Sequence, residues 1–139
     1  MAWDKSAKSI QVKGEMEVYE YVYTAGKNGE EFFKALKDKK ILGGRCEKCG
    51  RVFVPPKMFC EYCFGLLKLE EIKGKPIIDS FTVIYYDNDG KKLETPITVG
   101  FISFEGVEGG ILAYVEGVPE IGKEVEILEY NIPLRVKVK

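Results

Sequence analysis

The sequence contains no histidine and a single glutamine, Gln11, among its 139 residues. Without histidine, the chain cannot form a Ser-His-Asp triad, use an imidazole as a general base, or ligate a metal through one. Its uncharged stretches are far shorter than the ~18 to 20 apolar residues that a membrane-spanning helix needs. The first five residues lack the apolar core of a secretory signal. We therefore expect a cytoplasmic protein that does not associate with membranes.

The charge of the chain is nearly balanced, with 21 basic and 22 acidic residues and a net charge of −1. No strong overall field therefore attracts nucleic acid or a membrane surface. Residues 1–65 hold 12 basic and 9 acidic groups (net +3), and residues 66–139 hold 9 and 13 (net −4). Lysine accounts for 18 of the basic residues and glutamate for 17 of the acidic ones. This bias is typical of thermophiles.

The four cysteines form two Cys-x-x-Cys pairs separated by ten residues: Cys46, Cys49, Cys60 and Cys63. Each pair can bring two thiolates to one ion from a tight turn, and two such knuckles complete a tetrahedral zinc site. Gly50 follows the first knuckle and suits a turn with positive φ. Phe64 stands at the equivalent position of the second knuckle, which predicts a less regular turn there.

The segment between the knuckles supports a zinc ribbon. Residues 51–54 alternate like a short strand, and Pro55-Pro56 ends that strand. Four thiolates leave no position open for water or substrate, so we expect one structural Zn²⁺ per chain. Iron is the alternative ion, because it also accepts four thiolates. Disulfides are not expected in a reducing cytosol, and a redox site of the thioredoxin type needs only one such pair.

Residues 29–40 are predicted to form a helix that precedes the ribbon. Asn28 is the expected N-cap, with Glu31 completing a capping box. Phe32, Phe33 and Leu36 form its apolar face. Residues 15–24 favour a strand because valine and tyrosine dominate them, although a helical stripe is also present. A further helix is possible at the start of residues 1–14.

Residues 66–139 are predicted to form a small β-barrel of the OB-fold type. Turn residues separate the apolar runs, and the last run is expected to add an edge strand. The predicted domains are therefore an N-terminal segment (1–44), a zinc ribbon (45–65) and an OB-fold barrel (66–139). The expected strands are Leu67–Lys73, Pro76–Tyr86, Pro96–Glu105, Gly110–Glu116, Lys123–Glu129 and the edge strand Leu134–Val138.

No spacing marks paired carboxylates, an activated serine or a phosphate-binding glycine loop, so the sequence argues against an enzyme. Positive charge gathers in residues 34–57, which carry eight basic and two acidic groups, net +6. This region is either a solvated surface or a face that docks an anionic ligand or a partner. The acidic barrel disfavours binding to a phosphate backbone.

Several motifs resemble those of a family of rubredoxin-like zinc-ribbon and OB-fold proteins, known as domain of unknown function thirty-five. The ribbon motif runs from Leu42 to Gly50 (LGGRCEKCG) and from Pro55 to Cys63 (PPKMFCEYC). Weaker matches are DSFTV at 79–83, ILAYVEGV at 111–118 and IGKEV at 121–125. The resemblance covers about residues 28–130. Lys57 stands where arginine is common in the family, which keeps the charge but not the bidentate fork.

The resemblance implies a non-catalytic, acyl-CoA-binding or scaffold subunit of archaeal type. Its partner would be a thiolase, a hydroxymethylglutaryl-CoA synthase or a related acyl-CoA enzyme. A nucleic-acid-binding module and an enzyme acting on acyl-CoA thioesters are the alternatives. With acyl-CoA as the ligand, the candidate phosphate contacts are Arg45, Arg51 and Lys57, followed by Lys34 and Lys40.

Overall fold

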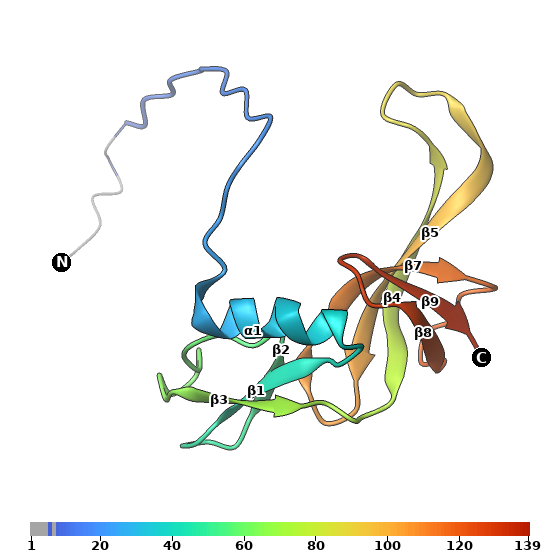
Figure 1. Cartoon of the computed structure of the whole chain (residues 1–139). Helices are drawn as coiled ribbons and strands as arrows, with labels where there is room; N and C mark the ends of the chain where they lie inside the picture. The colour runs from blue at the N-terminus through green and yellow to red at the C-terminus, as the bar shows by residue number, and fades with distance from the viewer. Residues whose placement is uncertain (1–5, 7) are drawn as a thin grey trace.

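A computed structural model describes residue 6 and residues 8–139. One helix and nine strands lie in these residues, and the strands form two sheets (Figure 1). The predicted mainly β fold, with a helix, a ribbon and a barrel, is confirmed. The elements are α1 (Gly26–Lys37), β1 (Leu42–Cys46), β2 (Val52–Val54), β3 (Leu67–Glu71), β4 (Pro76–Tyr86), β5 (Lys92–Phe104), β6 (Glu108–Gly109), β7 (Ile111–Glu116), β8 (Val125–Glu129) and β9 (Leu134–Val138).

The ribbon is built on a four-stranded sheet of order β3-β1-β2-β6. β1 pairs antiparallel with β2 and with β3, and the register places Cys46 opposite Leu67. β6 comes from the second half of the chain and pairs parallel with β2. The backbone N–H of Gly110 donates to the Val54 carbonyl at 2.9 Å beside this pair. A loop of the barrel therefore completes the sheet of the ribbon.

The barrel is a five-stranded sheet of order β4-β5-β7-β9-β8. Its two edges meet where the Ile78 N–H donates to the Lys123 carbonyl at 3.0 Å and the Gly122 N–H donates to the Ile78 carbonyl at 2.8 Å. β7 and β9 are parallel, whereas the other neighbours within the sheet are antiparallel. The structure thus has the five strands and partial closure of an OB-fold.

Two of the predicted strands lie elsewhere than expected. The first predicted barrel strand, Leu67–Lys73, is β3 and pairs with β1 in the ribbon sheet. The expected edge strand, Leu134–Val138, is β9 and lies between β7 and β8. Leu134 and Val136 are fully buried, so β9 contributes to the barrel core. β9 enters the barrel parallel to β7.

The helix begins and ends three residues earlier than predicted. Ala25 is its N-cap and makes no side-chain capping bond, so the expected capping box with Asn28 is absent. Lys39 ends the helix by adopting a φ of +59°. The N–H groups of Lys39 and Lys40 then donate to the carbonyls of Leu36 and Ala35, both at 3.0 Å. These two bonds form a Schellman motif, which satisfies the last carbonyls of the helix.

A single apolar core joins the helix to the barrel. Phe32 and Leu36 of α1 are buried in the same cluster as Val54 of β2 and the fully buried barrel residue Ile78, whereas the third predicted apolar residue, Phe33, is 48% exposed. Asn28 is also buried, and its Nδ2 donates to the Lys57 carbonyl at 2.7 Å. The helix is therefore anchored to both the barrel and the ribbon.

The strand predicted for residues 15–24 is absent. These residues form neither helix nor strand, and large side chains such as Met16, Tyr19 and Val22 are more than four-fifths exposed. A strand needs a partner for its backbone groups, and no element of the described chain supplies one. Residues 8–14 contain no helix, and the rest of the predicted N-terminal helix (residues 1–5 and 7) lies outside the described residues. Among residue 6 and residues 8–139, no helix is long and apolar enough to cross a bilayer.

Replacing Asn28 with alanine should destabilise the protein by ~1–2 kcal/mol, because the Lys57 carbonyl loses the donor that the buried Asn28 side chain provides. Denaturant unfolding of the wild type and the variant measures this difference. Asn88→Ala is the matched control, since Asn88 is exposed in the turn between β4 and β5. Equal losses in the two variants would show that the Asn28 bond does not anchor the helix.

Candidate metal centre

The two Cys-x-x-Cys turns have matching backbone geometry. In the first, the Gly50 N–H donates to the Cys46 carbonyl at 2.9 Å, and the Cys46 N–H donates to the Arg51 carbonyl at 2.8 Å. In the second, the Phe64 N–H donates to the Cys60 carbonyl at 2.9 Å, and the Cys60 N–H donates to the Gly65 carbonyl at 2.8 Å. The two knuckles therefore present their thiols from equivalent loops.

The second knuckle is as regular as the first, contrary to the expectation raised by Phe64. Phe64 adopts a φ of +59°, close to the +76° of Gly50 in the equivalent turn. A non-glycine residue in this region costs about 1 to 3 kcal/mol, and the surrounding contacts must hold it there. The Phe64 ring points into solvent and is 79% exposed, so it does not crowd the sulfurs.

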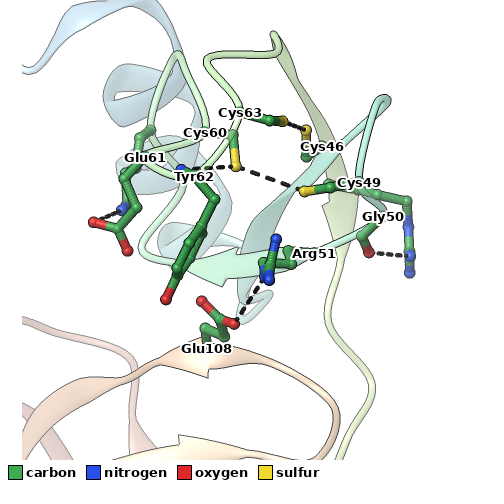
Figure 2. Close-up of polar contacts among 11 residues, drawn as sticks. Cys46, Cys49, Gly50, Arg51, Cys60, Glu61, Tyr62, Cys63 and Glu108 are labelled. Atoms are coloured by element: carbon green, nitrogen blue, oxygen red, sulfur yellow. Dashed lines mark hydrogen bonds and ion pairs between the residues drawn. The ribbon is translucent and has the colours of Figure 1, made fainter.

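The four sulfurs lie close enough to share one ion (Figure 2). All four Sγ atoms lie within 4.8 Å of one another. The Cys46 and Cys63 sulfurs are 3.3 Å apart, and those of Cys49 and Cys60 are 3.7 Å apart. Tetrahedral bonds of about 2.3 Å to zinc place sulfurs about 3.8 Å apart, so the cluster fits this ion. None of the four forms a disulfide, and together they provide a four-thiolate metal site.

The local environment makes the thiols unequal acids. The backbone N–H and the guanidinium of Arg51 outweigh burial and lower the pKa of Cys49 to about 6. The Gly65 N–H acts to lower the pKa of Cys63, but the neighbouring thiols and burial together raise it to about 11. Metal ligation requires thiolates, so a bound ion must displace the proton from Cys63. The Cys49 thiol therefore ionises more readily than the Cys63 thiol.

The arrangement binds a metal ion but offers it no reactive position. Cys46 and Cys60 are each 1% exposed, so the site is closed on their side. Four thiolates fill a tetrahedral shell, and no water or substrate can then reach the ion directly. The structure supports a metal centre that stabilises the fold.

Two of the lysines predicted to contact a ligand form ion pairs with nearby glutamates. Lys34 lies 3.1 Å from Glu30, and Lys57 lies 3.2 Å from Glu61. Both are pairs at i,i+4, a spacing that is visible in the sequence. Lys40 forms no ion pair with any described residue.

The two predicted arginines form ion pairs with glutamates that sequence reasoning did not single out. Arg45 forms a bidentate pair with Glu70 of β3, with both N···O distances at 2.9 Å. Arg51 lies 3.5 Å from Glu108 of β6 and stacks over the Tyr62 ring, 4.1 Å from its centroid (Figure 2). These pairs link strands that are distant in the chain, so no sequence spacing indicates them. Whether the cations also contact a ligand stays a prediction.

Comparison with known proteins gives the family. The model of the ChsH2 rubredoxin-like zinc ribbon domain matches residues 33–70. A DUF35 domain-containing scaffold protein of Methanothermobacter thermautotrophicus is 36% identical over 93 residues, which is 63% of this chain and 70% of that protein. The chain belongs to the DUF35 family. This result confirms the family resemblance drawn from the ribbon and barrel motifs.

Other DUF35 proteins agree with this assignment. A scaffold protein of the same description from Methanocaldococcus jannaschii is 30% identical over 93 residues, 62% of this chain and 64% of that protein, just under two thirds of its length. A DUF35 protein of unknown function from Sulfolobus solfataricus has a crystal structure with a TM-score of 0.78 and 45% identity, covering 82% and 87% of the two chains. The Ltp2-ChsH2(DUF35) aldolase structure shares the fold, with a TM-score of 0.57, 22% identity and coverage of 78% and 92%.

Removing the metal should unfold the ribbon before the barrel. The buried cluster of the ribbon consists of Cys46, Cys60, Phe53 and Leu67, so half of it is metal ligand. We expect one ion per chain by elemental analysis, and a chelator should increase hydrogen exchange at β1 and β2 more than at β7 and β9. Unchanged exchange in the ribbon after the ion has left would contradict this view of the site.

Gly65→Ala should lower the metal content, because a Cβ at this position would lie 2.9 Å from the Cys46 sulfur. Phe64→Gly is the matched variant in the same turn. It should keep one ion and raise stability by about 1 kcal/mol, since glycine adopts a positive φ without strain. Metal content and thermal unfolding of both variants test the prediction. A Gly65→Ala protein that retains a full complement of metal would refute the close approach.

Proposed function

We propose that this DUF35 protein is a non-catalytic scaffold subunit that associates with a thiolase or a hydroxymethylglutaryl-CoA synthase-type enzyme. The closed metal site carries the proposal, because four thiolates around one ion stabilise a structure and leave no position for chemistry. The name "scaffold protein" of the two archaeal relatives supports the same role. We further propose that the ion is Zn²⁺ and that acyl-CoA is the ligand class of the assembly.

The outer surface of the barrel supports binding to a partner. Residues opposite each other on neighbouring strands share a face of the sheet. Leu112 of β7 is opposite Phe101 of β5, and Tyr114 is opposite Val99. Leu112 and Tyr114 alternate with buried residues of β7 and are 55% and 45% exposed. Their side chains therefore form an apolar patch on the outside of the barrel.

The patch continues along the hairpin formed by β4 and β5, which projects beyond the other strands (Figure 1). Ile84 is opposite Ile97, and these residues are 38% and 40% exposed. Tyr85, on the other face of β4, is 52% exposed. A two-stranded hairpin with apolar side chains on both faces is only marginally stable in water. A folded partner of largely apolar surface would stabilise it by covering these side chains.

Nucleic-acid binding, the alternative from the sequence, has weaker support. The OB-fold is compatible with it, but residues 66–139 carry a net charge of −4. Arg45, Arg51, Lys34 and Lys57 form ion pairs with carboxylates, so each of these four cations must break a pair before it contacts a phosphate backbone. The charge distribution therefore favours a protein partner over nucleic acid.

The proposal predicts that the tagged chain captures a thiolase or a hydroxymethylglutaryl-CoA synthase from a lysate of its source organism. Leu112→Glu should reduce the recovery of this enzyme at least about tenfold, because a charge in the centre of an apolar interface is left unpaired. Mass spectrometry identifies the captured protein, and size-exclusion chromatography of the purified pair measures the complex.

Val118→Glu is the matched control for this experiment. Val118 is 80% exposed but lies in the loop between β7 and β8, outside the patch. It should leave the recovery of the enzyme unchanged. Capture of ribosomal or replication proteins in place of an acyl-CoA enzyme would overturn the proposal, as would thioesterase or thiolase activity of the isolated chain.

A further inference from the structure

A cleft of about 390 Å³ lies between the end of α1, the link from β3 to β4, and strand β8. Its lining brings together parts of the ribbon side and parts of the barrel. The buried residues Ile41, Phe104 and Val125 give it an apolar floor. Tyr130, which is half-buried, adds a phenol group to the wall. The cleft is thus a concave site of mixed character, distinct from the metal centre and from the apolar patch.

Lysines are the main charged groups of the cleft. Lys39, Lys40, Lys73 and Lys139 line it, against only two glutamates, Glu71 and Glu126, a net charge of +2 among the lining residues. Lys139 is paired with Glu124 at 2.8 Å. The other three lysines form no ion pair with any described residue.

This lack of pairing distinguishes the cleft lysines from the cations of the ribbon. Arg45 and Arg51 are held by glutamates of neighbouring strands, and Lys57 is held by Glu61. An ammonium group that is already paired must break that pair before it binds an external anion. Lys39, Lys40 and Lys73 have no ion pair to break. They come from two separate segments of the chain and line one cleft.

The backbone fixes the attachment points of all three unpaired lysines. The Schellman motif at the end of α1 holds Lys39 at a φ of +59° and ties the Lys40 N–H to Ala35. The Ile72 N–H donates to the Ile41 carbonyl at 2.8 Å, which holds the Lys73 segment beside the end of the helix. The ammonium groups are mobile on their stems, but their attachment points are set by the fold.

We propose that this cleft binds a phosphate ester, with the phosphate between Lys39, Lys40 and Lys73 and an uncharged part of the ligand over the apolar floor. Lysine ammonium groups bind phosphate as point charges, and a dianion suits three of them better than a single carboxylate does. This inference deepens the proposed function. The choice of a phosphopantetheine carrier as the ligand rests on that function, because the proposed partner acts on acyl-CoA. A nucleotide phosphate has the same chemistry and is the other source to be distinguished.

The test is a titration of the isolated full-length chain, followed by amide chemical shifts in NMR spectra. The probes are ADP, phosphopantetheine, coenzyme A and inorganic phosphate. We expect shifts at residues 39–41, 72–74 and 125–127 with at least one of the three organic probes, and an affinity that falls as salt is raised. ADP binding alone would identify the nucleotide as the source, and phosphopantetheine binding alone would identify the carrier arm.

The double variant Lys40→Gln/Lys73→Gln should weaken binding of the best probe by roughly tenfold or more. Both side chains are exposed, so the fold should persist, and the spectra of the free variant verify this. Lys91→Gln/Lys92→Gln in the hairpin removes the same charge far from the cleft and should bind like the wild type.

The inference would be overturned by an absence of shifts at millimolar concentrations of all three organic probes, or by shifts that cluster at Arg45 and Arg51. Equal binding by the two double variants would overturn it as well. Inorganic phosphate that binds as tightly as the esters would also overturn it, since the apolar floor would then contribute nothing. Capture of the acyl-CoA enzyme by the Lys40→Gln/Lys73→Gln protein is measured in a separate experiment. If this variant captures the enzyme and the wild type binds none of the probes, the scaffold function stands and only the proposed ligand site in the cleft is refuted.

Discussion

Coordination of one ion by four thiolates is the interaction on which the ribbon depends. The buried cluster there contains only Cys46, Phe53, Cys60 and Leu67, too little apolar surface to fold unaided. The metal replaces the missing core by joining two loops whose backbone geometry is the same. This requirement also explains why all the cysteines of the chain are used for structure and none remains for catalysis.

The helix and strand β2 join the ribbon to the barrel. Phe32 and Leu36 of the helix and Val54 of β2 share one core with the barrel strands, and Asn28 ties the helix to the loop before Cys60. Four of the eight cations in residues 34–57 form ion pairs with carboxylates of the same molecule. The two binding sites that we propose are the uncovered apolar patch and the lysine cleft.

The sequence was sufficient to predict features whose physical cause is local. Cysteine spacing indicated the metal ligands, and alternation indicated strands such as β4 and β7. It failed where distant residues decide the outcome. The membership of β3 in the ribbon sheet, the position of β9 inside the barrel and the ion pairs of Arg45 and Arg51 all depend on strand pairing. The end of the helix was missed because a lysine, rather than a glycine, adopts the positive φ there.

The pairing of β6 with β2 has a consequence for how such proteins are recombined. Because Glu108 and Gly109 form the last strand of the ribbon sheet, the ribbon is not encoded by one continuous stretch of sequence. A fragment that stopped after β3 would leave the edge of β2 bare and prone to self-association. Grafting this ribbon onto another protein would require transplanting the β5–β7 connection as well, so the two halves of the chain are expected to be inherited together.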